Sequence, residues 1–141
     1  MAFREKSAWI TLATTLIVYG GYFALAVPRL LAGRFGGFEF VAWLSTAILV
    51  IVVLQVGLTV IAAVSDPRGA RQPRDEREQL IALRANRAGF YTLEVGGFFA
   101  IVTLFWWNDA AVIANGVFFA IVLAEVVRAG FQIVDYHRCV A

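Results

Sequence analysis

The stretch that decides the fold is residues 40–64, FVAWLSTAILVIVVLQVGLTVIAAV, which carries no charged side chain. A helix needs about 20 predominantly apolar residues to cross a hydrocarbon layer about 30 Å thick. Three further stretches, at residues 7–27, 88–107 and 110–130, are long and apolar enough to do the same. The sequence therefore predicts an all-α integral membrane protein, a four-transmembrane-helix bundle that forms a single domain over residues 1–141.

The composition supports this class. Of the 141 residues 61% are hydrophobic, so the predicted spans use most of the chain and leave no room for a separate soluble domain. Because Arg4 and Lys6 precede the first apolar run, a cleaved signal peptide is the alternative for that span. The run is too long for the hydrophobic region of a signal peptide and lacks a clear cleavage site, so we expect an anchored helix.

Lysine and arginine are distributed unevenly between the two sides of the predicted spans. The N-terminal tail carries two, the loop at residues 65–87 carries six and the C-terminal segment carries two, whereas the opposite side has only Arg29 and Arg34. Cytoplasmic loops retain positive charge, so both termini are predicted to be cytoplasmic. The basic residues between positions 66 and 78 alternate with acidic ones, which is typical of a solvated helix and does not favour binding to nucleic acid.

Polar side chains follow one face of each of the last two predicted spans at the three-or-four-residue spacing of a helix. If these spans form an antiparallel hairpin that turns at residues 108–111, residues at equal depth have numbers that sum to about 219. The predicted pairs are Arg84 with Asp135, Arg87 with Gln132, Tyr91 with Arg128, and Glu94 with Glu125. Charged groups in a bilayer are costly unless they face a partner, a cavity or water. We therefore predict one buried polar seam between the two helices, in the cytoplasmic half of the membrane.

This seam has two interpretations. It is either a network that locks the helices together, or an ion or proton site in which Glu94 and Glu125 share a proton or pair with Arg128. The first is favoured, because Phe98 and Phe118 replace the polar residues where the same two faces continue toward the outer half of the membrane.

Other chemistry finds little support in the sequence. The chain lacks a nucleophile with a base and an orienting group, a glycine-rich phosphate loop and a Cys-x-x-Cys motif, so we predict that it is not an enzyme. Asp135, His137 and Cys139 are neighbours, but on a helix His137 points away from the other two, and no metal site is predicted. A single His with no second axial ligand argues against haem, so no cofactor is expected.

An internal repeat relates the two halves of the chain. Residues 19–25, YGGYFAL, resemble residues 95–101, VGGFFAI, and weaker matches follow in the next spans. A duplication predicts two similar hairpins related by a pseudo-twofold axis along the membrane normal, and chance similarity between apolar segments is the alternative. Glycines without side chains allow close helix packing, so we expect the first and third spans to touch at two glycine pairs. These pairs are Gly20 with Gly21 and Gly96 with Gly97.

The third helix is predicted to be longer than the membrane is thick. Pro73 favours a helix start and no breaker occurs before Trp107, so a helix over residues 73–107 would extend roughly two turns into the cytoplasm. We expect this extension to dock against the protein's own C-terminal segment, residues 130–138. The run at residues 75–87, DEREQLIALRANR, resembles the cytoplasmic motif of uncharacterised small multi-span bacterial inner-membrane proteins. The resemblance implies a location in the bacterial inner membrane and no particular activity.

These features predict a non-enzymatic membrane protein that acts as a structural or regulatory interaction module. Its expected partners are the lipid bilayer and either a second copy of the chain or another protein bound through the cytoplasmic helix. The alternative is a small proton-coupled transporter or ion-conducting protein that uses Glu94 and Glu125. A second alternative is a protein that binds lipid or another hydrophobic ligand.

Overall fold

The structure is a computed structural model that describes residues 3–33, 37–67, 75–106 and 109–138. Almost all of this part of the chain is helical, which confirms the predicted all-α class. The helices are α1 (Phe3–Leu31), α2 (Gly37–Ser65), α4 (Glu76–Val102) and α5 (Ala110–Arg138), with a short 3₁₀ helix, η1 (Thr103–Phe105), after α4. Among the described residues, α1, α2 and α5 are the helices long and apolar enough to cross a membrane, whereas α4, which contains most of the predicted span at residues 88–107, is not one of them.

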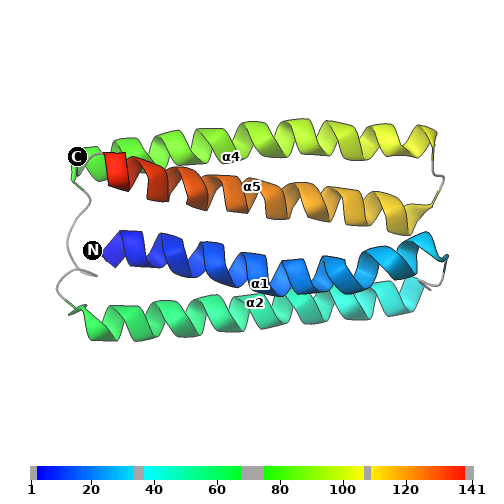
Figure 1. Ribbon diagram of the computed structural model, residues 1–141, viewed down its shortest axis with the longest axis horizontal. Coiled ribbons are helices and arrows are strands. Elements are labelled where there is room, and N and C mark those ends of the chain that lie inside the picture. The colour runs from blue at the N-terminus through cyan, green and yellow to red at the C-terminus, as the bar shows by residue number, and fades with distance from the viewer. Residues whose placement is uncertain (1–2, 34–36, 68–74, 107–108, 139–141) are drawn as a thin grey trace.

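The four long helices lie in the order α2, α1, α5, α4, and each runs antiparallel to the next (Figure 1). α5 packs against both α4 and α1, and α1 packs against α2 as well, so α2 and α4 are the end helices of the row. The beginning of α1 and the end of α5 lie at the same end of the molecule as the end of α2 and the beginning of α4. The two hairpins α1–α2 and α4–α5 therefore point the same way, as the internal repeat predicts.

α4 is shorter than the predicted helix over residues 73–107. It begins after Asp75, whose side chain accepts a hydrogen bond from the Glu76 N–H as an N-cap does, and Pro73 lies outside the described residues. It ends at Val102, where the chain tightens into η1, and the Thr103 hydroxyl donates to the Ala100 carbonyl at 2.6 Å. The prediction that one α-helix continues to Trp107 is therefore wrong.

The first turns of α4 lie beside the last turns of α5, as predicted for the C-terminal segment (Figure 1). Ile81 and Ala85 of α4 are buried, and so are Ala129 and Ile133 of α5. The N-terminal part of α4 consequently does not project alone from the molecule.

Small residues form the contact between α4 and α5. A Cβ placed on Gly96 would lie 2.7 Å from the Cβ of Ala120, and one on Gly116 would lie 3.4 Å from the Cβ of Ala100. About two turns before Gly96 on α4, a Cβ on Gly89 would lie 3.2 Å from the Ala124 carbonyl oxygen. Such small-residue faces let two backbones approach closely, which is how helices gain packing energy in a membrane where lipid already satisfies apolar surface.

The register of this hairpin differs slightly from the prediction. The contacts of Gly96 with Ala120 and of Ala100 with Gly116 join residues whose numbers sum to 216, three less than predicted. The difference arises because α4 ends at Val102 and α5 begins only at Ala110, where Asp109 accepts a hydrogen bond from the Ala111 N–H at 2.8 Å. The reversal is therefore centred earlier in the chain than expected.

The second contact surface joins α1, α2 and α5 through an aromatic cluster. The ring of Phe118 makes edge-to-face contacts with Tyr19 and Tyr22, with centroids 5.1 and 5.4 Å apart. Tyr22, Ala26, Ala47, Phe118 and Val122 form the core cluster of buried residues here. Aromatic edge-to-face pairs add stability beyond the area that they bury.

The expected packing of the two glycine pairs against each other is wrong. α5 lies between α1 and α4, so these two helices are not packed neighbours. Gly96 packs against Ala120 of α5, whereas a Cβ on Gly20, Gly21 or Gly97 would meet no atom within 4 Å. A pseudo-twofold axis that exchanges the two hairpins would match the contact of α1 with α5 by a contact of α4 with α2. α1 packs on α5, but α4 and α2 are not packed neighbours, so the arrangement departs from the predicted symmetry.

Candidate functional site

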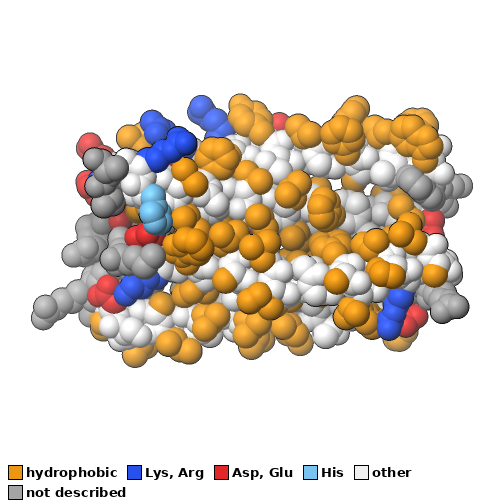
Figure 2. Space-filling view, in the orientation of Figure 1, with side chains coloured by type: hydrophobic (Ala, Val, Ile, Leu, Met, Phe, Trp, Pro, Cys, Tyr) orange, Lys and Arg blue, Asp and Glu red, His pale blue; other side chains and the backbone are white. Residues whose placement is uncertain are grey.

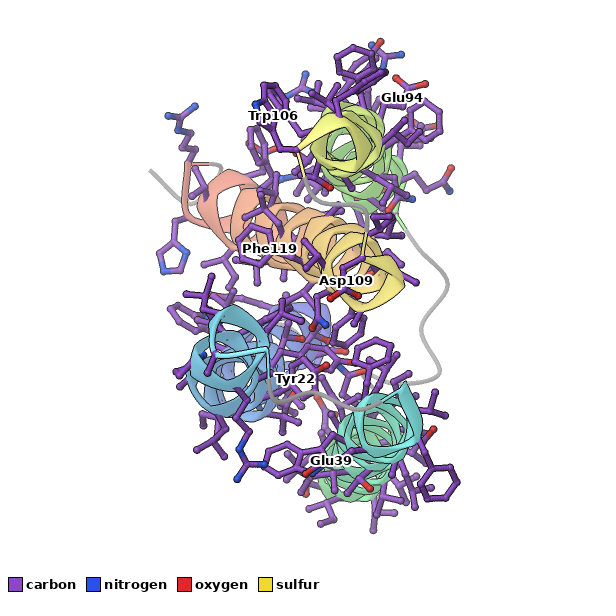
Figure 3. The ribbon with its side chains drawn as sticks, turned by 90° about the vertical axis from the view of Figure 1, so that its right-hand side faces the viewer. Tyr22, Glu39, Glu94, Trp106, Asp109 and Phe119 are labelled. Atoms are coloured by element: carbon purple, nitrogen blue, oxygen red, sulfur yellow. The ribbon has the colours of Figure 1, made fainter. Side chains whose placement is uncertain are left out.

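The polar stripe of α4 lies on the surface of the molecule. Its members are all exposed: Arg84, Arg87, Tyr91 and Glu94. The face that packs on α5 is instead the one with Ala85 and Gly89, and Glu94 points away from the other helices (Figure 3). The structure thus does not bring the two predicted stripes together. The small-residue face is in contact because long arginine and tyrosine side chains would hold the two backbones apart.

The polar stripe of α5 is half-buried and finds its main partner within its own helix. Arg128 donates from Nη2 to Oε2 of Glu125 at 2.6 Å and from Nε to the same oxygen at 3.1 Å. Glu125 thereby pairs with the arginine one turn away instead of with Glu94. Gln132 and Asp135 continue the same face, and Asp135 Oδ2 is buried with no hydrogen-bond partner among the described residues.

Polar groups of α1, α2 and α5 lie at about the same level along the bundle as this ion pair. Tyr22 with Asn115 and Glu5 with His137 fix the register of α1 against α5, which puts Glu125 level with roughly residues 12–17 of α1. At that level Gln55 of α2 donates to the Thr15 hydroxyl of α1 at 3.4 Å, and Tyr19 lies within electrostatic reach of Glu125. The middle of the molecule therefore contains a polar layer, from α2 through α1 to α5.

Sequence reasoning missed the most deeply buried polar contact. The Tyr22 hydroxyl donates to Asn115 Oδ1 at 3.1 Å, and Asn115 Nδ2 donates to the Ala111 carbonyl at 2.8 Å. The sequence signal for this contact was the single amide side chain of Asn115 within the apolar span at residues 110–130, because an amide inside a membrane needs a hydrogen-bond partner. α1 thus makes a polar side-chain contact with each neighbour, through Tyr22 with Asn115 of α5 and through Thr15 with Gln55 of α2.

The ends of the bundle carry most of the remaining charge (Figure 2). Arg29 at the end of α1 lies 4.0 Å from Glu39 of α2, and its guanidinium carbon lies 4.3 Å from the centre of the Trp43 ring. At the opposite end, His137 Nδ1 lies 3.9 Å from Glu5 Oε1. These contacts tie α1 to its neighbours at both ends. Exposed pairs of this kind contribute little to stability, typically below about 1 kcal/mol.

Two apolar grooves follow the helix contacts. The larger, about 690 Å³, lies between α4 and α5 and is lined by Val95, Phe99, Phe119 and Leu123 around the small-residue contact. Tyr91, Thr92 and Thr103 also line it. The two threonine hydroxyls donate to backbone carbonyls within their own helix turns, to Ala88 and Ala100, so most of the groove is hydrocarbon surface. The smaller, about 470 Å³, lies between α1 and α2 beside Trp43. Over the described ranges, no three His, Cys, Asp or Glu side chains come close enough to hold a metal ion.

Comparison of the chain with protein families, with curated proteins and with solved structures gave no match. The class of protein therefore follows from the fold alone: an antiparallel row of four helices, three of them long and apolar enough to cross a membrane. The resemblance of residues 75–87 to small bacterial inner-membrane proteins stays a prediction.

Proposed function

We propose that this protein is a four-span protein of the bacterial inner membrane, with both termini cytoplasmic, that functions as an interaction module. Its docking surface is the outer face of α4, defined by Arg84, Arg87, Tyr91 and Glu94. The partner is a helix of a protein in the same membrane.

The observation that carries this proposal is the position of Glu94. By the register of Gly96 with Ala120, Glu94 is level with about Val122 of α5, near the middle of that helix. α4 packs along α5, so a bilayer that contains α5 also surrounds this part of α4. An exposed carboxylate at the centre of a hydrocarbon layer costs about 2.5–3.5 kcal/mol on insertion scales, and such groups normally face protein or water. A partner helix on this face would remove that cost.

The proton-coupled alternative is supported less well. It needs Glu94 and Glu125 to act on one path, but Glu94 lies on the outer face of α4 and Glu125 is bound by Arg128 on α5. The lipid-binding alternative has the two apolar grooves in its favour, yet no charged side chain that could select a lipid headgroup is among their described lining residues.

A photo-crosslinking amino acid tests the docking surface in native membranes. Placed at Tyr91, which is 58% exposed on the outer face of α4, it is expected to give a discrete protein adduct. Placed at Val53, which is 62% exposed on α2, it is expected to give lipid adducts only. The Tyr91 adduct should disappear in Glu94→Lys and persist in Glu39→Lys. Lipid adducts alone at Tyr91 would overturn the proposed function.

A further inference from the structure

The polar face of α5 complements the outer face of α4 in charge. The α4 stripe contains two arginines and one glutamate, whereas the α5 stripe of Glu125, Arg128, Gln132 and Asp135 contains two acids and one arginine. The Glu125 and Arg128 side chains remain 44% and 38% exposed, so neither α1 nor α4 of the same chain covers this face completely. Each stripe therefore has polar side chains that its own chain does not cover completely.

The two stripes also match in depth. Side chains on a helix lean toward its N-terminus, so the carboxylate of Glu94 lies nearer the level of Tyr91 and the guanidinium of Arg128 nearer the level of Glu125. In the register of the hairpin, the level of Tyr91 on α4 corresponds to about residue 125 on α5. Two copies inserted at the same height and in the same direction therefore present Glu94 and the Arg128 guanidinium at one depth.

We infer that the partner on the outer face of α4 is a second copy of this chain, whose α5 polar face receives the α4 stripe. This inference rests on the proposed function and names its partner. Glu94 of one copy then joins the ion pair of Glu125 and Arg128 in the next copy, and Arg87 reaches the amide oxygen of Gln132. Charge-assisted hydrogen bonds of this type are the strong ones, and they set register between helices.

The contact uses two different faces, so it is heterologous. Each copy donates its α4 and accepts the α4 of a neighbour, which closes into a ring when the rotation between copies permits. The expected assembly is consequently a cyclic oligomer in which every copy has both faces covered.

Disulfide crosslinking between two differently tagged copies tests this contact in membranes, in a Cys139→Ser background. Glu94→Cys in one copy is expected to crosslink to Ile121→Cys in the other. Ile121 lies on α5 about one turn before Glu125 and two turns before Arg128, on the same face, and is 46% exposed. Ile17→Cys is the control, since it lies at about the same depth on α1 and is 74% exposed. Crosslinking of Glu94→Cys to Ile17→Cys and not to Ile121→Cys would overturn the inference.

A charge exchange provides the second measurement, with purified protein reconstituted in liposomes. Glu94→Arg alters an exposed residue, so the fold should persist while self-association weakens at least about tenfold, because two arginines then face each other. Adding Arg128→Gln should recover association, because the Glu125 carboxylate of the next copy is then free to pair with the introduced positive charge. Absence of association between wild-type copies would overturn the inference. If the Tyr91 photo-adduct then has the mass of a different protein, the proposed function stands, and if Tyr91 gives lipid adducts only, both fall.

Discussion

Gly96 and Gly97 are adjacent in the same helix yet have opposite surroundings, which makes them a matched pair. Gly96→Ala places a Cβ 2.7 Å from the Ala120 Cβ and 3.3 Å from its Cα, whereas Gly97→Ala meets open space. Both changes gain about 0.5–1 kcal/mol of helix propensity. Overpacking at Gly96 should cost about 1–3 kcal/mol, so only Gly96→Ala should lower the free energy of unfolding. Reversible unfolding in mixed micelles, followed by circular dichroism, measures this difference. Equal effects of the two changes would contradict the α4–α5 contact.

Tyr22 and Asn115 provide a test of the buried polar contact between α1 and α5. Tyr22→Phe removes the hydroxyl that donates to Asn115 Oδ1 and keeps the ring against Phe118. We expect a loss of about 0.6–1.7 kcal/mol, the range found for hydrogen bonds between membrane helices. The same unfolding measurement applies, with Tyr91→Phe as the control because Tyr91 is exposed. A neutral Tyr22→Phe together with a destabilising Tyr91→Phe would reverse the roles assigned to these two residues.

At the scale of the element, helices were predictable and their contact faces were not. Long apolar runs bounded by breakers such as Asp75 and Asp109 specify where helices lie, because a membrane leaves few other ways to satisfy the backbone. α4, however, offers two faces at helical spacing, one with Arg87 and Glu94 and one with Gly89 and Gly96. The polar pattern suggested the first, and close backbone approach selected the second. This choice also moved the candidate site. The residues of the two charged stripes were predicted from the sequence, but the surfaces on which the stripes lie were not.

The ion pair within α5 can be tested as a structural unit in detergent-solubilised monomers. Glu125→Gln leaves the Arg128 charge without its carboxylate, and we expect the free energy of unfolding to fall by about 2–3 kcal/mol. Glu125→Gln combined with Arg128→Leu should return close to the wild type, because a neutral apolar pair needs no partner. Glu39→Gln, which affects the exposed pair with Arg29, should change stability by less than about 1 kcal/mol. Failure of the double variant to recover stability would assign Arg128 a further partner within the chain.

At the scale of the whole molecule, the open row of helices explains why the halves of the repeat do not behave alike. α5 has neighbours on two sides and α1 does as well, but α2 and α4 each have one. α2 is almost uniformly apolar and mostly exposed, which suits contact with lipid. α4 is also an end helix, but it carries charge on its exposed face. Of the two end helices, α4 is therefore the one that we expect to need a partner.

The direction in which the row crosses the membrane gives the last prediction. Ser65 at the end of α2 and His137 near the end of α5 lie at one end of the bundle, and Asp109 before α5 lies at the other (Figure 1). Single cysteines at these three positions, in a Cys139→Ser background, can be labelled with a membrane-impermeant thiol reagent. Because lysine and arginine are concentrated with the chain termini, only the cysteine at Asp109 should react in intact cells. The cysteines at Ser65 and His137 should react once the membrane is opened, and all three should react equally in detergent. Labelling of Ser65→Cys and Asp109→Cys from the same side would mean that α4 and α5 do not both cross the bilayer, and the cost assigned to Glu94 would then disappear.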